Sequence, residues 1–409
     1  MQFICIAGIS FILYCVVKKL CIITKIECQV LYLAVGMIIG ILLQWTPFES
    51  VDQIFPSIIL YNNVALLFVF FVSGFSIQLS QLVKSGPVTA KLFSIPAYVE
   101  AFIMAGVLML LTPLHFIESL LIASIFAMAS PANIVSSCVH MIQTGNVGKN
   151  NLPSTMIMTT IVDSFITIPI VFSCIFIFIQ QGANAFQIIK ILVLILIGII
   201  AAILVGVVIG RLELVGLKKI FKKIKMQYVI ILIAFLIAFL LTMVLKSFHT
   251  IEKAVVVFGI LIMFGIGLSI NHFDTSGVNK IIASHGNMLF AMFGMPAIFT
   301  YVGSIIDISI LLNIKLLIVL IAITILAVVI KGWTTRWVLK EKKYSSAERK
   351  FASYCFIPKG VALINFSMIF GSILGNEDPI VVFMRMLETI CILTTMTIGI
   401  PKIKKSKLE

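Results

Sequence analysis

The chain has 409 residues, of which 61% are hydrophobic and only 11% are charged, whereas a soluble globular domain carries about 25% charged residues. This composition excludes a water-soluble protein and makes the lipid bilayer the solvent for most of the chain. The net charge of +14 would suggest a nucleic-acid partner in a soluble protein, but basic cytoplasmic loops explain it in a membrane protein, so we expect no nucleic acid.

Apolar runs separated by charged or turn-rich breaks predict an all-α polytopic fold with about 13 transmembrane helices. About 20 apolar residues cross a hydrocarbon core roughly 30 Å thick. The first run has no basic segment before it, so we interpret it as a span and not as a signal peptide. The predicted spans are residues 2–17, 28–45, 55–75, 90–112, 116–142, 152–180, 186–210, 226–246, 252–270, 284–307, 314–337, 350–374 and 379–400.

The distribution of positive charge over the predicted loops indicates an orientation. With the N-terminus outside, the inside loops hold 23 Lys and Arg residues, and the outside loops with their helix ends hold 4. Cytoplasmic loops of membrane proteins are enriched in Lys and Arg. We therefore expect a multi-pass protein of the cell membrane, with its N-terminus outside and its C-terminus in the cytoplasm.

The eight cysteines show no CxxC spacing. The sequence therefore predicts neither a zinc site nor a disulfide framework, and we expect no cofactor.

Two predicted spans, 116–142 and 350–374, carry a proline near their middle. A proline inside a helix removes a backbone donor and opens the preceding turn. Open backbone at membrane depth is tolerated where it is buried in protein or lines a cavity, although a simple proline kink would give either break alone. The residues at the two breaks are Ser130, Pro131 and Asn133 in the first span, and Pro358, Lys359 and Gly360 in the second.

The two broken spans belong to a repeated pattern. They are the fifth and the twelfth span, so an odd number of steps separates them and they run in opposite directions. A span with a charged residue in its interior precedes each of them, and another such span follows. Helices four to six and eleven to thirteen therefore predict inverted repeats with two crossed broken helices, an architecture in which secondary transporters bind ions near the bilayer centre. The flanking charges are Glu100 and Asp163 around the first break, and Lys331 and Arg385 around the second.

Asp163, near the middle of its span, is the candidate ion and proton carrier. Ionisable residues within a span are costly and are usually paired or functional. A buried carboxylate can hold a proton or an alkali cation, but not both at once, and competition for it is sufficient for exchange. The alternative is a buried salt bridge that only ties helices together. The oxygens that could complete a shell for a hard cation are the hydroxyls of Thr159, Thr160 and Ser164 and the backbone oxygens from Ser130 to Asn133.

Three further charges are candidate partners of this site. Glu100 could pair with Lys331, its counterpart in the other repeat, and such a pair could be purely structural. Lys331 could instead snorkel to the membrane interface. Lys359 follows the second break directly, where a cation would offset the negative end of a half-helix.

These stretches resemble sodium/proton antiporters of the cation/proton antiporter superfamily, in particular the NHA-type branch of sodium/hydrogen exchangers and its bacterial relatives. The likeness is carried by residues 127–180, with Ala-Ser-Pro-Ala-Asn and Thr-Thr-Ile-Val-Asp-Ser, by Lys331-Gly-Trp-Thr-Thr, and by Phe-Ile-Pro-Lys359-Gly. The resemblance implies that Asp163 carries the ion and the proton, with Lys331 as its basic partner. The first acid of the family's acidic pair is Val162 here, which implies electroneutral exchange.

The resemblance also implies a core domain that moves like an elevator and a second domain that forms a homodimer. Along this chain it assigns dimerisation-type helices to residues 1–80 and, with a linker, to 183–310. The two core repeats are then residues 81–182 and 311–401, and residues 402–409 form a basic cytoplasmic tail.

The function predicted on these grounds is exchange of protons for Na+ or Li+, with K+ as a further candidate. A sodium-coupled symporter of a small organic anion shares the predicted architecture and is the alternative. A membrane-embedded enzyme is disfavoured, because the sequence has no HExxH motif and no nucleophile elbow.

Overall fold

The computed structural model is built of helices throughout the part of the chain that it describes, which confirms the predicted all-α class. The chain forms two compact units, which we name unit 1, residues 1–79 and 196–306, and unit 2, residues 80–195 and 307–409. The described residues are 1–43, 45–46, 50–75, 79–130, 134, 137–138, 141–142, 144–148, 151–179, 185–220, 223–246, 252–274, 277–306, 313–340, 344–360, 363–364, 371, 374–375 and 378–408.

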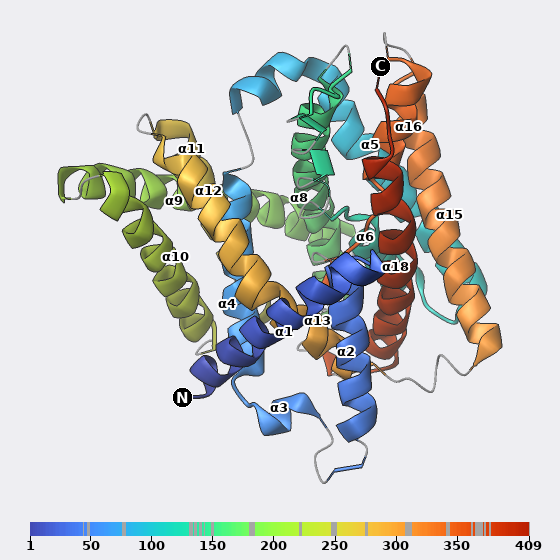
Figure 1. The fold of residues 1–409 in the computed structure, drawn as a ribbon. Coiled ribbons are helices and arrows are strands. Elements are labelled where there is room, and N and C mark those ends of the chain that lie inside the picture. Colours follow the sequence, from blue (N-terminus) through green and yellow to red (C-terminus); the bar gives the residue numbers. More distant parts are fainter. Residues whose placement is uncertain are drawn as a thin grey trace. The chain divides into compact units, whose positions relative to one another are not determined.

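Unit 1 contains the N-terminal helices and the middle of the chain (Figure 1). Helix α9 (Ala185–Ile220) runs from unit 2 into unit 1. The other elements are α1 (Gln2–Thr24), α2 (Cys28–Leu43), α3 (Val51–Ile54), α4 (Ile58–Gly74), α10 (Lys223–Lys246), α11 (Glu252–Phe273), α12 (Val278–Leu289), the short π-helix η1 (Phe290–Gly294) and α13 (Met295–Ser304).

Close contacts at glycine hold the helices of unit 1 together. A Cβ atom on Gly40 of α2 would lie 2.7 Å from the carbonyl oxygen of Ser304 at the end of α13. A Cβ on Gly74 of α4 would lie 2.6 Å from the carbonyl oxygen of Phe264 in α11. Small residues at such positions let helix backbones approach in a bilayer, where the hydrophobic effect does not drive helices together.

A disulfide bond between Cys21 and Cys28 joins the end of α1 to the start of α2. The sequence predicts no disulfide framework, and it did not indicate this single bond, because the spacing of seven residues is not a CxxC pattern. The free cysteines among the described residues are Cys5, Cys15, Cys138, Cys174, Cys355 and Cys391.

Unit 2 holds six helices from the two halves of the predicted repeat, in its described part (Figure 1). Helix α6 packs on α8, and α15 packs on both α16 and α18. The helices are α5 (Leu79–Leu111), α6 (Phe116–Ala127), α8 (Leu152–Ile179), α15 (Ile314–Val338), α16 (Ser346–Cys355) and α18 (Pro379–Lys404).

Both predicted breaks are real interruptions of helices. Helix α6 ends at Ala127 and residues 128–130 are not helical, and α16 ends at Cys355 before the non-helical residues 356–360. The backbone N–H of Ser130 donates a hydrogen bond of 3.0 Å to the carbonyl oxygen of Pro358. The two broken helices therefore meet at their breaks, as expected for crossed helices. Pro131 and Asn133 lie outside the described residues.

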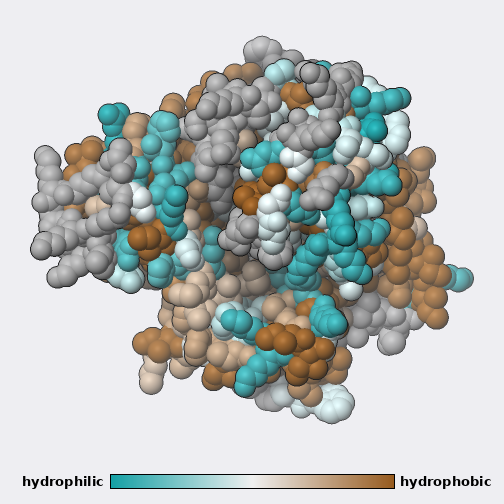
Figure 2. Space-filling view, turned by 45° about the horizontal axis from the view of Figure 1, so that its top comes forward, coloured by the Kyte–Doolittle hydropathy of each residue, from teal (hydrophilic) through white to brown (hydrophobic). Residues whose placement is uncertain are grey.

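Every predicted span coincides with a described helix or, at the breaks, with a helix that stops where the break was predicted. Six helices among the described residues are long and apolar enough to cross a membrane, and several shorter apolar helices accompany them. Helix α15 is the most apolar of the six, and Figure 2 shows its outer face as a brown band at the right-hand edge. The long candidates are Gln2–Thr24, Pro87–Leu111, Ile197–Leu217, Val278–Ser304, Ile314–Val338 and Pro379–Lys404.

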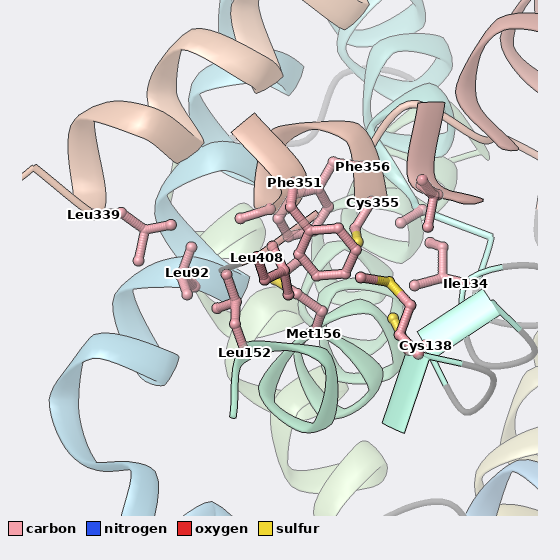
Figure 3. Packing of buried hydrophobic residues seen from close by; sticks show 14 of the residues in the cluster. Leu92, Ile134, Cys138, Leu152, Met156, Leu339, Phe351, Cys355, Phe356 and Leu408 are labelled. Carbon is pink, nitrogen blue, oxygen red and sulfur yellow. The ribbon is translucent and has the colours of Figure 1, made fainter. Parts of the chain in front are cut away.

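One hydrophobic cluster packs the two chain segments of unit 2 against each other (Figure 3). Leu152 and Met156 enter it from α8, and Phe351 and Cys355 enter it from α16. Helix α16 begins with a capping box, in which the Ser345 hydroxyl accepts from the Glu348 backbone and the Glu348 carboxylate accepts from the Ser345 backbone. The cluster also includes Ala129 at the first break and Phe356 at the second, so it reaches both breaks.

Candidate ion and proton site

Four charged side chains are buried together in unit 2, on elements from both of its chain segments. Each is at most 1% exposed. Two are acids and two are bases, so the group can be electrically balanced in the interior, where an unpaired charge would be very costly. They are Glu100 on α5, Asp163 on α8, Lys331 on α15 and Lys359 in the break after α16.

Asp163 pairs directly with Lys331. The Lys331 ammonium lies 3.0 Å from Oδ2 and 3.1 Å from Oδ1 of the carboxylate. The backbone N–H of Ala129, in the first break, donates to Oδ2 over 2.9 Å. Lys331 also donates to the carbonyl oxygen of Ala127, the last residue of α6. The opened backbone of the first break therefore supplies one donor to the acid and one acceptor to the base.

Glu100 connects the two lysines. Its carboxylate oxygens lie 3.0 and 3.2 Å from the Lys359 ammonium, and Oε2 lies 3.4 Å from the Lys331 ammonium. Lys331 therefore contacts both acids, and the pairing with Glu100 that the repeat suggests exists beside the pairing with Asp163. Since Lys331 is completely buried, it does not snorkel to the interface.

The second break is anchored to α18 and supplies an aromatic ring to the site. The backbone N–H of Lys359 donates to the Thr395 hydroxyl over 3.1 Å. The ring centroid of Phe356 lies 4.9 Å from the Lys331 ammonium, a cation–π contact. Thr395 was not singled out from the sequence, and Phe356 was noted only as the first residue of the Phe-Ile-Pro-Lys359-Gly stretch, without a role.

The predicted oxygen ligands come from the helix of Asp163 and from the first break, and they are buried where the structure describes them. Thr159 and Thr160 are fully buried, and their hydroxyls donate to the carbonyl oxygens of Thr155 and Met156 one turn earlier. A hydroxyl that donates in this way still offers oxygen lone pairs to a cation. Ser130 is buried at the first break. The Ser164 side chain and the whole of Asn133 lie outside the described residues.

The amino-acid sequence matches one known protein family over nearly its whole length. The family described as "Sodium/hydrogen exchanger, transmembrane" matches residues 7–401 of this chain, nearly its whole length. The chain belongs to this family. The exchanger is therefore a multi-pass membrane transporter and not an enzyme. Family membership also favours sodium/proton antiport over the symport alternative.

Solved structures agree with this assignment at the level of the fold. The exchanger is similar to the sodium proton antiporter MjNhaP1 from Methanocaldococcus jannaschii at pH 8, with 19% identity and a TM-score of 0.72 over 98% of this chain and 97% of that one. An electron-microscopy map of the same antiporter gives 18% identity and a TM-score of 0.71 over 97% and 94% of the two chains. No curated protein sequence matches the exchanger.

Proposed function

We propose that the exchanger swaps one proton for one monovalent cation at Asp163, with Na+ or Li+ as the cation and K+ as a further candidate. The observation that supports this most strongly is the environment of the carboxylate. Asp163 is fully buried, and its charge is balanced by a lysine ammonium and one backbone N–H. A proton or a small cation can replace the ammonium as the partner of this carboxylate.

The cation-bound state follows from the contacts of Lys331. An entering cation would take the Asp163 carboxylate together with the hydroxyl oxygens of Thr159 and Thr160, since hard cations prefer oxygen ligands. The displaced ammonium of Lys331 keeps a carboxylate partner, because Glu100 is already 3.4 Å away. Lys331 can therefore stay protonated when the cation binds.

The proton-bound state uses the same carboxylate. Protonation of Asp163 removes its negative charge and with it the attraction for a cation, so the proton and the cation exclude each other. Val162 occupies the position before Asp163, so no second acid adjoins it in the sequence to bind an additional proton. Exchange of one proton for one monovalent cation is then electroneutral.

The two units suggest how the site changes sides. All four charges and both breaks belong to unit 2, which we assign as the moving core, with residues 81–182 and 311–401 as inverted repeats. Unit 1 would be the scaffold and the homodimer contact. The loop charges favour an external N-terminus and a cytoplasmic C-terminus in the cell membrane.

Transport in liposomes tests the role of Asp163. The purified protein is reconstituted with a pH-sensitive dye inside, and Na+, Li+ or K+ is added outside. We expect cation-driven proton movement that Asp163→Asn reduces at least about a hundredfold, because the amide carries no charge for a cation and binds no exchangeable proton in this range.

The matched control is Glu118→Gln, an acid of the same unit that caps α6 by accepting from the backbone N–H of His115. Glutamine preserves this capping contact, so the control should transport at the parental rate. The proposal would be contradicted by an Asp163→Asn protein as active as the parent, or by a parent protein that moves no protons in response to any alkali cation.

A further inference from the structure

The segment after α18 is packed into unit 2, although four lysines within residues 402–407 suggest a solvated tail. We name residues 405–408 the strap. Its Leu408 is only 3% exposed and belongs to the hydrophobic cluster of unit 2. Figure 3 shows Leu408 among Leu152, Met156 and Phe351. A leucine buried between helices of both repeats indicates a specific docking contact.

One amide side chain holds the strap by its backbone. The Asn146 Nδ2 group donates to the carbonyl oxygen of Ser406 over 2.8 Å, and the Asn146 Oδ1 atom accepts from the backbone N–H of Leu408 over 2.9 Å. Both polar ends of this side chain are thus used on two alternate residues of the strap. Asn146 lies in the connection between the first break and α8.

The neighbouring Gly148 explains how this connection fits beneath the strap. Its φ angle is +67°, a backbone conformation that favours glycine. A Cβ there would lie 3.3 Å from the Leu408 Cβ and 2.7 Å from the Glu348 carboxylate at the start of α16. The strap, the connection before α8 and the start of α16 are therefore in close contact.

The strap's cluster continues to the residues that hold the ion site. It includes Ala129, whose N–H binds Asp163, and Phe356, whose ring faces Lys331. It also includes Met156, seven residues before Asp163 on α8, which corresponds to about 10 Å along a helix. Loss of packing at Leu408 can therefore loosen the packing of Ala129 and Phe356 at the two breaks, because all three residues belong to one cluster.

We propose that the strap is a conformational latch, which docks on the ends of α8 and α16 and thereby positions both breaks for cation binding. Release of the strap loosens the cluster and weakens cation binding at Asp163. Asn146 and Leu408 act as positioning residues, because neither contacts the four charges in the described contacts. The effect on transport rests on the proposed function, whereas the docking of the strap does not.

The test uses Cys138 and Cys355 as reporters, since both are fully buried in the strap's cluster. The full-length protein is labelled with N-ethylmaleimide, and each cysteine is quantified by peptide mass spectrometry. Asn146→Ala and Leu408→Ala should each speed labelling of these two cysteines about tenfold. This is the change in the opening equilibrium that we expect when one or two hydrogen bonds, or a comparable apolar contact, are lost. Asn146→Asp keeps the acceptor for Leu408 and should give an intermediate rate.

Two controls separate release of the strap from unfolding. Lys407→Ala changes an exposed strap residue and should label like the parent. Cys174 and Cys391 are buried outside the cluster, and their labelling should not change in any variant. Faster labelling of all four buried cysteines would mean general loosening of the fold and would overturn the latch.

Transport supplies the second readout. The sodium concentration for half-maximal exchange should rise several-fold in Asn146→Ala and Leu408→Ala, with Asn146→Asp between them and the parent. Unchanged labelling of Cys138 and Cys355 would overturn the docked strap. Faster labelling with an unchanged sodium dependence would overturn its link to the ion site. If the parent itself fails to exchange cations, the proposed function is wrong, and the labelling still decides whether the strap docks.

Discussion

At the scale of single residues, the four buried charges form one chain of contacts, from Asp163 through Lys331 and Glu100 to Lys359. Such a chain tolerates the removal of a complete pair better than the removal of one member, because a single deletion leaves an uncompensated charge in the interior. The Glu100–Lys359 pair is the part of the chain that Asp163 does not contact directly. Its coupling can therefore be measured through stability without changing the Asp163 carboxylate itself.

We expect Glu100→Gln and Lys359→Met each to destabilise the protein by about 3 kcal/mol, while the double variant costs less than either single variant. The reason is that Lys331 keeps Asp163 as a partner when both members of the pair are gone. Apparent melting temperatures in detergent provide the measurement, with Glu118→Gln as the control outside the group. Additive losses in the double variant would contradict the coupling.

The residues of this site differ in how far the sequence predicts them. Asp163, Lys331 and Lys359 stand out because a charge inside an apolar span is rare. The sharing of Lys331 between two acids did not follow from the sequence, since spacing along separate helices gives no distance between them. The contributions of Ala127 and Ala129 were equally hidden, because they come from backbone groups that any residue possesses.

At the scale of helices, proline and apolar run length were sufficient to locate the spans and both breaks. The packing of these helices was less predictable, because glycine occurs on lipid-facing and on packed positions alike. Gly40 is close to the backbone of α13, whereas a Cβ on Gly8 of α1 meets nothing within 4 Å. The burial of Leu408 was not predicted, because the lysines that precede it suggest a segment exposed to solvent.

This pair of glycines gives a prediction at the same scale. Gly40→Ala should lower the apparent melting temperature, because a methyl group 2.7 Å from the Ser304 carbonyl oxygen forces α2 and α13 apart, at an overpacking cost of about 1–3 kcal/mol. Gly8→Ala is the matched control in the same unit and should melt like the parent. Equal melting of the two variants would show that the α2–α13 contact can relax without cost.

At the scale of the whole molecule, the division into two units separates the charges of the site from most of the remaining spans. Unit 2 contains Glu100, Asp163, Lys331 and Lys359, as well as both breaks. Under the proposed function, cation binding and protonation would therefore take place within one compact body. If that body moves as a whole, the charge that it carries across the membrane is set by the group of four charges and its bound ion.

The charge balance of this group predicts an exchange that does not respond to voltage. Asp163 with a bound proton and Asp163 with a bound Na+ carry the same net charge, and the other three charges are unchanged when Lys331 shifts from Asp163 to Glu100. In liposomes with the membrane potential clamped by K+ and valinomycin, we expect the same steady-state sodium gradient at 0 and at about −100 mV. Movement of one net charge per cycle would add about 2.3 kcal/mol per 100 mV and shift that gradient roughly 50-fold. Asp163→Asn liposomes measure the passive leak, and a shift of that size above the leak would rule out electroneutral exchange.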